Sequence, residues 1–193
     1  MIVDMGGGTT DIAIITLGGI VSSNSIRYAG DKIDAAIVQF IRRKYSLIIG
    51  DATAERLKIE IGCAMNDKDE NGEDIVLTAK ARGKDIISGL PKTIEVTSTD
   101  MKEAIIESLD MIVDGIKTTV EKAPPEIASD VAENGIVISG GSSKIRNFDK
   151  LITQRTGMAV TVADNPLEAV VLGAAKSLED PDKLMTYIKK LRR

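Results

Sequence analysis

The feature that most constrains this chain is its opening segment, residues 1–16, which reads MIVDMGGGTTDIAIIT. Two short apolar runs flank a triple glycine, so the segment predicts a β-hairpin whose first strand carries one carboxylate, Asp4. The glycines at 6–8 have no Cβ, so the backbone of this turn can approach an anion and direct its N–H groups at phosphate oxygens. An ordinary glycine-rich hairpin turn is the alternative. The flanking Asp4 and the Thr-Thr-Asp sequence at 9–11 favour the phosphate site.

The side chains around this turn suit a magnesium–phosphate ligand. Magnesium prefers carboxylates together with its own water molecules, so we expect Asp4 to hold the ion through water. Thr9 and Thr10 add hydroxyl donors beside it. The segment therefore predicts half of a phosphate clamp.

Composition excludes several classes of function. The 193 residues are 43% hydrophobic and 28% charged, which is typical of a soluble globular protein of one sizeable domain or two small ones. No apolar run approaches the ~18 residues that span a bilayer, and a net charge of −4 gives no reason to expect nucleic acid as a partner. Histidine is absent, which excludes Ser-His-Asp and Cys-His nucleophiles and His-ligated metals. Carboxylates, hydroxyls and lysines remain, and they suit magnesium-assisted phosphoryl transfer.

Cysteine usage and the first residues indicate where the protein works. Cys63 is the only cysteine, so no disulfide can form within the chain, and a reducing cytoplasm is the natural setting. Met1 opens directly into an apolar strand pattern without a secretory signal. We therefore expect a cytoplasmic protein.

Hydrophobic periodicity predicts alternating strands and helices, hence an α/β fold. Three strands are expected within residues 1–28, followed by a helix with an apolar face that opens at residues 29–31. Downstream we expect the following elements: a helix over about 52–63 capped by Asp51, a solvated acidic loop at 66–74, strands at 75–82 and 93–97, a long helix capped by Thr97 or Ser98 and ended by Pro124-Pro125, a strand at 135–139, a helix near 147–156, a short strand at 159–162 and a helix from 166 to about 177.

Two further segments are candidates for ligand contacts. Glu55 and Lys58 are three residues apart and share a helix face, where the carboxylate can accept from a ribose hydroxyl while the lysine stem lies against a purine. A surface ion pair between them is the alternative, and for this segment alone it is favoured. The run from Gly135 to Arg146 is an apolar strand that ends in Gly-Gly-Ser and leads toward a helix. In α/β folds, ligands bind beyond the carboxyl ends of such strands.

Taken in order, the motifs resemble those of the actin, sugar-kinase and heat-shock-chaperone ATPase superfamily. Within it, the chain is similar to the MreB-like bacterial actins from residue 2 to about residue 178. The motifs that carry the resemblance are Asp-x-Gly-Gly-Gly-Thr-Thr-Asp at 4–11, Ala-Gly-Asp at 29–31, Thr-Ala-Glu-x-x-Lys-x-Glu-Ile-Gly at 53–62, Gly-Leu-Pro-Lys at 89–92, Pro-Pro-Glu at 124–126 and Gly-Gly-Ser at 140–142.

The resemblance implies the second lobe of the actin fold. Residues 1–30 and 131–193 would form a ribonuclease-H-like subdomain, with a smaller α/β subdomain inserted over 31–130. ATP and magnesium would be the cofactors, and a first lobe with its own phosphate hairpin and water-activating carboxylate has no counterpart in this sequence.

The resemblance also assigns roles to individual residues. Asp4 would serve the magnesium shell, and Thr10 would help to position the attacking water. The β- and γ-phosphates would be bound by Gly6, Gly7 and Gly8, and Thr9 would lie beside Thr10 in the cofactor site. The adenosine would be flanked by Glu55 and Lys58, with Arg56 and Leu57 between them in the same cofactor-binding segment, and the nucleotide would be backed by Gly140, Gly141, Ser142 and Ser143.

The sequence departs from the MreB pattern at two places. MreB proteins usually have Glu at the position of Asp11, and a third glycine followed by apolar residues where Ser142, Ser143 and Lys144 stand. The second departure is closer to the chaperone pattern.

For the intact protein the resemblance implies ATP-dependent polymerisation into membrane-associated filaments that set cell shape. The lobe would contribute filament contacts, while the chain alone would be inactive as an ATPase. Two alternatives are an ATPase fragment of a heat-shock-type chaperone and a half-actin scaffold without turnover.

The C-terminal segment, residues 182–193, combines an apolar helical stripe with basic residues. This pattern is typical of helices that lie on anionic membranes, which would place the protein at the inner face of the cell membrane. A final helix that docks its stripe on the body of the protein is the alternative. The stripe consists of Leu184, Tyr187, Ile188 and Leu191.

Overall fold

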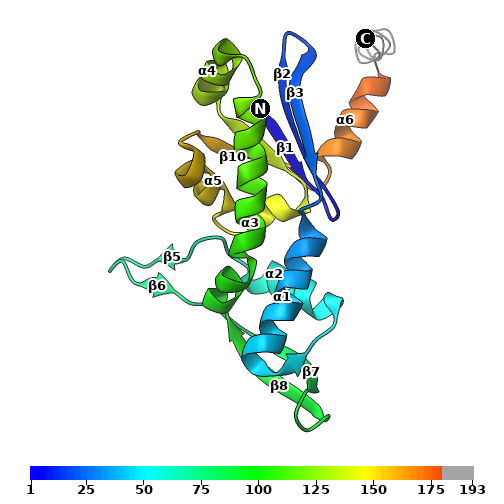
Figure 1. The fold of residues 1–193 in the computed structure, drawn as a ribbon, viewed down its shortest axis with the longest axis vertical. Helices are drawn as coiled ribbons and strands as arrows, with labels where there is room; N and C mark the ends of the chain where they lie inside the picture. The colour runs from blue at the N-terminus through cyan, green and yellow to red at the C-terminus, as the bar shows by residue number, and fades with distance from the viewer. Residues whose placement is uncertain (180–193) are drawn as a thin grey trace.

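A computed structural model describes residues 1–179 and confirms the predicted α/β class. The main sheet has five strands in the order β10-β9-β1-β2-β3. β1 pairs antiparallel with β2 and parallel with β9, so segments from the two ends of the described chain meet in one sheet (Figure 1). The strands are β1 (Ile2–Met5), β2 (Thr10–Thr16), β3 (Gly19–Ile26), β9 (Ile136–Ser139) and β10 (Val160–Val162).

A smaller antiparallel sheet, in the order β4-β7-β8, lies at the other end of an elongated molecule (Figure 1). A two-stranded ribbon, β5–β6, projects to the side. Two helices, α1 and α2, pack between the two ends. These elements are α1 (Gly30–Tyr45), β4 (Leu47–Ile48), α2 (Asp51–Ile61), β5 (Asp67–Lys68), β6 (Asp74–Ile75), β7 (Thr78–Asp85) and β8 (Pro91–Thr97).

The long helix α3 (Ser98–Glu121) ties the two ends together, because it contacts β8 and α1 at one end and β2 and β3 at the other. Its start is fixed by a capping box: Thr97 accepts from the backbone N–H of Asp100, whose carboxylate accepts from the backbone N–H of Thr97. The prediction of a Thr97 cap is thereby confirmed. Its predicted apolar face is fully buried, as are Ile33, Ile37 and Ile41 of α1.

The structure differs from the sequence prediction where helices begin. Pro125 does not only end a helix; it occupies the first turn of α4 (Pro125–Asn134), because the N–H that proline lacks has no partner in a first turn. Asp51 is the first residue of α2, and Gly50 is the N-cap without a side-chain hydrogen bond.

Two strand regions also differ from the prediction. The predicted acidic loop at 66–74 contains the β5–β6 ribbon, and the strand expected at 75–82 begins and ends three residues later as β7.

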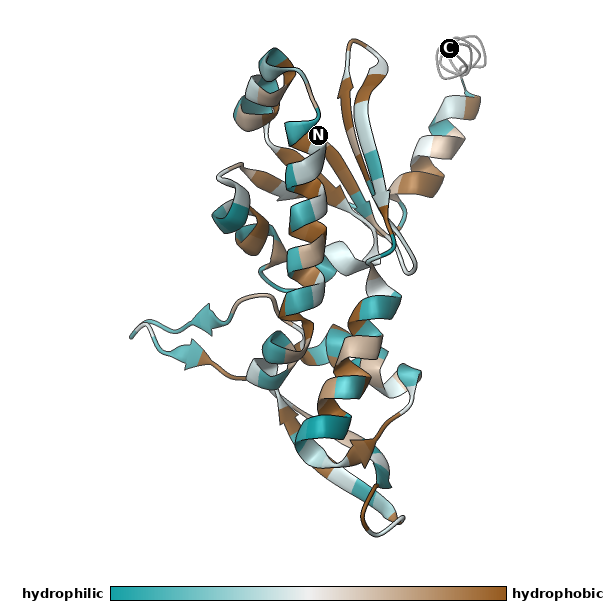
Figure 2. Cartoon of the chain, viewed as in Figure 1, coloured by the Kyte–Doolittle hydropathy of each residue, from teal (hydrophilic) through white to brown (hydrophobic). Residues whose placement is uncertain are grey.

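The last described elements are a 3₁₀ turn and two helices. These are η1 (Gly141–Lys144), α5 (Phe148–Thr156) and α6 (Ala169–Leu178). α6 extends away from the body of the molecule, and none of its residues is buried (Figure 2). Its apolar side chains Val170, Val171 and Leu178 are 66%, 64% and 71% exposed. Within residues 1–179, no helix has the length and apolarity needed to cross a membrane. The predicted amphipathic tail at 182–193 lies outside the described residues.

Candidate functional site

A cleft of about 460 Å³ lies where the glycine turn, α1, α2 and η1 meet. It is lined by residues from the three segments that the sequence predicts to contact a ligand. These are Gly6 and Gly7 from the first turn, Glu55 and Lys58 from α2, and Gly141 and Ser142 from η1. The fold thus brings the separate motifs to one place.

The glycine turn is held from below by the first turn of α1. The backbone N–H groups of Gly30 and Asp31 donate to the carbonyls of Gly6 and Gly7 at 3.1 and 2.8 Å. These contacts satisfy two of the N–H groups that the start of a helix leaves unpaired. In the described part of the chain, the N–H groups of Gly7 and Gly8 donate to no protein acceptor. They remain available for an anion.

The two glycine turns lie side by side because β1 and β9 run parallel and end at the same edge of the sheet. The Ser142 hydroxyl donates to the carbonyl of Gly6 at 3.3 Å. Gly140 packs on β1, and its N–H donates to the carbonyl of Pro166. Ser143 is buried and donates to the carbonyl of Gly140 at 2.7 Å, so it shapes the turn from behind.

Asp4, Thr9 and Thr10 lie around the glycine turn but do not line the cleft. Oδ1 of Asp4 accepts from the Ser139 hydroxyl at 2.7 Å. The Thr10 side chain is fully buried and donates to the carbonyl of Tyr28 at 2.6 Å, while Thr9 donates to Asp11 at the surface. The predicted role of Thr10 toward an attacking water stays a prediction.

Of residues 55–58, the first and the last line the cleft and the two between them do not. Lys58 does not pair with Glu55; its ammonium donates to Asp34 of α1 at 2.8 Å. Leu57 is fully buried in the core. Arg56 turns away from the cleft to Glu60 at 2.6 Å and to the carbonyl of Lys80. The structure therefore brings Glu55 and Lys58 to the cleft, and Arg56 and Leu57 elsewhere.

Several cleft residues were not assigned a role from the sequence. Asp31 and Asp34 lie three apart on α1, and Lys144, Ile145 and Leu167 complete the opposite side. The signal for the two acids was present, because they follow Ala29-Gly30 at the spacing of one helix face. Burial raises the pKa of Asp34 above its usual range, against the lowering effect of Lys58.

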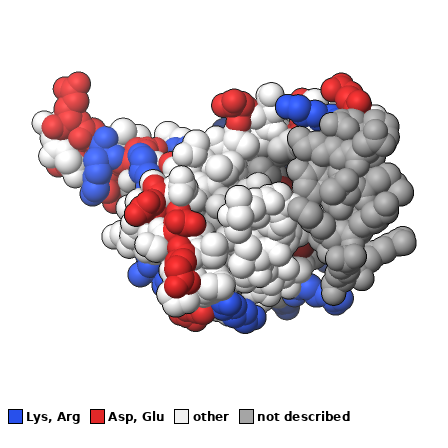
Figure 3. All heavy atoms as spheres, turned by 90° about the horizontal axis from the view of Figure 1, so that it is seen from above, with Lys and Arg blue, Asp and Glu red and all other residues white. Residues whose placement is uncertain are grey.

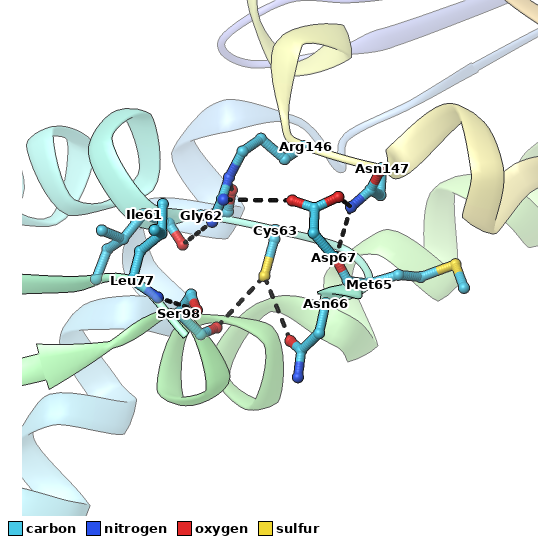
Figure 4. Close-up of polar contacts among 10 residues, drawn as sticks. All are labelled: Ile61, Gly62, Cys63, Met65, Asn66, Asp67, Leu77, Ser98, Arg146 and Asn147. Atoms are coloured by element: carbon cyan, nitrogen blue, oxygen red, sulfur yellow. Dashed lines mark hydrogen bonds and ion pairs between the residues drawn. The ribbon is translucent and has the colours of Figure 1, made fainter. Parts of the chain in front are cut away.

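Figure 4 shows the contacts between the C-terminal end of α2 and the segment that follows η1. The Arg146 guanidinium donates to the carbonyls of Ile61 and Gly62 at 3.1 and 3.3 Å, at the end of α2. Asn147 donates to Asp67 and to the carbonyl of Met65 at 2.8 and 2.9 Å. A segment directly after η1 thus caps the helix that carries Glu55 and Lys58.

Cys63 lies in the same cluster and is buried (Figure 4). Its thiol is 3.4 Å from the carbonyl of Ser98. Burial raises the pKa of the thiol, which disfavours the reactive thiolate form.

Comparison with known proteins assigns the family. The family model described as MreB/Mbl protein matches residues 1–186. The cell shape-determining protein Mbl of Bacillus subtilis is 42% identical over 184 residues, which cover 95% of this chain and 54% of Mbl. The cell shape-determining protein MreB of Escherichia coli is 43% identical over 179 residues, which cover 93% of this chain and 50% of MreB. The chain spans about half the length of the curated relatives it matches.

Solved structures agree with the sequence matches. MreB 5 of Spiroplasma citri bound to AMPPNP is similar with a TM-score of 0.88 and 34% identity, over 96% of this chain and 54% of that one. A MamK double helical filament is similar in fold, with a TM-score of 0.68 and 24% identity over 86% of this chain and 50% of that one. The family model covers nearly the whole chain, so the chain belongs to the MreB/Mbl protein family.

Proposed function

We propose that this chain is the nucleotide-binding lobe of an MreB-like bacterial actin and binds ATP with magnesium in the cleft. The observation that carries the proposal is the convergence of Gly6, Gly7, Glu55 and Lys58 with Gly141 and Ser142 of the second glycine turn on one cavity. It is supported by the similarity to Spiroplasma citri MreB structures bound to AMPPNP and to ADP. In fold terms, residues 1–30 and 131–193 would be the ribonuclease-H-like subdomain and 31–130 its insertion.

The residues present fit a magnesium ion that is held mainly by the phosphates of the nucleotide. Within residues 1–179, no group of three or more acidic or thiol side chains could form a metal cage. Asp4 offers a single carboxylate next to the glycine turn, with one oxygen fixed by Ser139. Magnesium usually takes one or two carboxylates together with substrate phosphates and water. When bound, the ion would neutralise phosphate charge, while Asp4 would hold its water shell.

The family match favours the bacterial actin over the chaperone alternative. Self-association into filaments is supported by the apolar turns at opposite ends of the long axis (Figure 1). Leu17 of the β2–β3 turn is 97% exposed at one end, and Ile87 and Leu90 of the β7–β8 turn are 86% and 65% exposed at the other. Seen from above, the face at this end has an uncharged area with acidic and basic side chains along part of its edge (Figure 3). Head-to-tail association needs such different surfaces at the two ends.

The missing first lobe would be the other partner. The matched relatives are about twice as long as this chain's matched part, and α6 exposes an apolar stripe that the described residues do not cover. We infer that α6 docks on that lobe.

The intact protein would work in the cytoplasm, at the inner face of the membrane through residues 182–193. A half-actin scaffold that lacks turnover is the second candidate, because the chain matches only half of its relatives.

Titration calorimetry with ATP and magnesium tests the proposal. We expect saturable binding by the 193-residue chain, weakened by Glu55→Ala, which removes a cleft carboxylate. Glu60→Gln is the matched control on α2, because Glu60 pairs with Arg56 and does not line the cleft. Absence of binding, or equal binding by the chain and by Glu55→Ala, would contradict the proposed site.

A further inference from the structure

The ion pair between Asp34 and Lys58 joins the two helices that form the inner side of the cleft. Asp34 comes from α1 and Lys58 from α2, and both residues line the cavity. Their side chains are 15% and 12% exposed, and Oδ2 of Asp34 lies 2.8 Å from the ammonium of Lys58. The pair is therefore nearly closed off from water although it borders a cleft.

The other carboxylate oxygen of Asp34 has no partner. Among the described residues, Oδ1 of Asp34 is the buried side-chain polar atom without a hydrogen bond. Native structures satisfy most such atoms, so this one needs an explanation. Burial, followed by the nearby carboxylates Glu55 and Asp31, works against ionisation of Asp34. The hydrogen bond and the charge of Lys58 offset part of this penalty.

Another ion pair on the same helix is far more exposed. Arg56 and Glu60 pair at 2.6 Å, but their side chains are 43% and 45% exposed. Exposed pairs of that kind are screened by solvent and contribute little. A buried pair with an unsatisfied oxygen is poorly suited to stabilising the fold, since desolvation offsets its attraction. The effect of the Asp34–Lys58 pair is therefore to fix the positions of the two side chains.

We propose that Asp34 is a positioning residue that fixes Lys58 for the nucleoside end of the ligand. This inference rests on the proposed nucleotide function. A lysine side chain has four rotatable bonds, and ordering it on binding costs affinity. Asp34 orders it in advance, so the lysine stem is a ready wall of the cleft. One of the three ammonium N–H donors is taken by Asp34, which leaves donors for the ligand.

The test compares ATP with tripolyphosphate, which lacks the nucleoside, by titration calorimetry on the 193-residue chain. In Asp34→Asn we expect about tenfold weaker ATP binding and unchanged tripolyphosphate binding, since a freed lysine no longer forms the nucleoside wall. Lys58→Met should weaken ATP similarly, and the double variant should be no weaker than Lys58→Met alone, because the two residues act as one unit. Glu60→Gln, the exposed partner on α2, should match the wild type.

The outcomes separate this inference from the function on which it rests. If the wild-type chain binds no ATP, the proposed function fails and this inference fails with it. If the wild type binds ATP and Asp34→Asn binds it equally well, or loses ATP and tripolyphosphate alike, the positioning role alone is wrong. Should Asp34→Asn not fold, Lys58→Arg keeps the charge but moves it, and normal ATP affinity in that folded variant would overturn the inference.

Discussion

Gly140 lies against the end of β1 so closely that a Cβ built on it would stand 2.3 Å from the carbonyl oxygen of Met5. Its φ of +82° is also in the region that favours glycine. This contact seats the Gly-Gly-Ser turn beside the triple-glycine turn. Glycine is therefore needed at position 140 for two reasons: its positive φ, and the close approach of its backbone to that of Met5, which places the two glycine turns side by side.

Gly140→Ala should consequently destabilise the fold strongly. We expect a loss of roughly 3 kcal/mol or more in the free energy of unfolding, from a clash with backbone added to an unfavourable φ. Gly157→Ala is the matched control: its φ is +75°, but nothing lies within 4 Å of the added Cβ. It should cost only about 1 kcal/mol. Urea unfolding followed by circular dichroism measures both, and equal losses would show that the Met5 contact is not limiting.

A second prediction concerns stability in acid. Burial of Asp100 opposes its ionisation, but Lys44 at 2.7 Å, the backbone N–H of Thr97 and the Tyr45 hydroxyl outweigh it and lower the pKa to about 2. Because the folded pKa is below the usual aspartate value of 3.8, the ionised form stabilises the fold above pH 4. That contribution, about 2 kcal/mol, is lost as the pH falls from about 4 to about 2.

The measurement is the free energy of unfolding between pH 6 and pH 2 for the wild type and Asp100→Asn. The difference between them should be largest at pH 6 and should shrink below pH 4. Asp114→Asn serves as the control, because Asp114 is 68% exposed and 3.9 Å from its nearest cation, Lys117. A difference between wild type and Asp100→Asn that is constant with pH would contradict the assigned pKa.

A third prediction separates transition-state contacts from binding contacts. In a two-lobe protein reconstituted with the first lobe, Asp4→Ala should lower kcat far more than Glu55→Ala. Asp4 would act on charge that develops during phosphoryl transfer, whereas Glu55 would bind the ground and transition states alike. Glu55→Ala should raise KM and spare kcat. Steady-state ATPase assays decide, and equal losses in kcat would mean that the roles are misassigned.

The sequence predicted the motifs of the cleft better than their contacts. The turn at 6–8 and the apolar faces of α1 and α3 were readable, because spacing and helical periodicity express them directly. The partner of Lys58 was not, because Asp34 lies on another helix and only the packing of α1 on α2 brings the two together. Likewise the Thr10 hydroxyl looked available in the sequence, but in the fold it donates a hydrogen bond to the carbonyl of Tyr28.

A fourth prediction is that the 193-residue chain alone will not hydrolyse ATP measurably. In phosphoryl transfer most of the rate enhancement comes from orienting the water and stabilising charge on the transferred group. The resemblance to the actin superfamily implies that half of those groups would belong to a first lobe, and the chain covers about half of the length of its relatives. Phosphate release by the purified chain should match a protein-free blank. Turnover above that blank, abolished by Asp4→Ala, would show that one lobe suffices.

The final prediction concerns the basic tail. If residues 182–193 lie on a membrane as an amphipathic helix, each basic residue near an anionic leaflet contributes about 1 kcal/mol, and the apolar stripe adds burial among the headgroups. Co-sedimentation with liposomes should then require anionic lipid, weaken with salt and disappear when 182–193 are deleted. Exchanging Lys189 and Lys190 for glutamate should weaken binding while the stripe is kept. Binding that survives the deletion would show that the tail is structural or idle, and equal binding to neutral liposomes would contradict the electrostatic contribution.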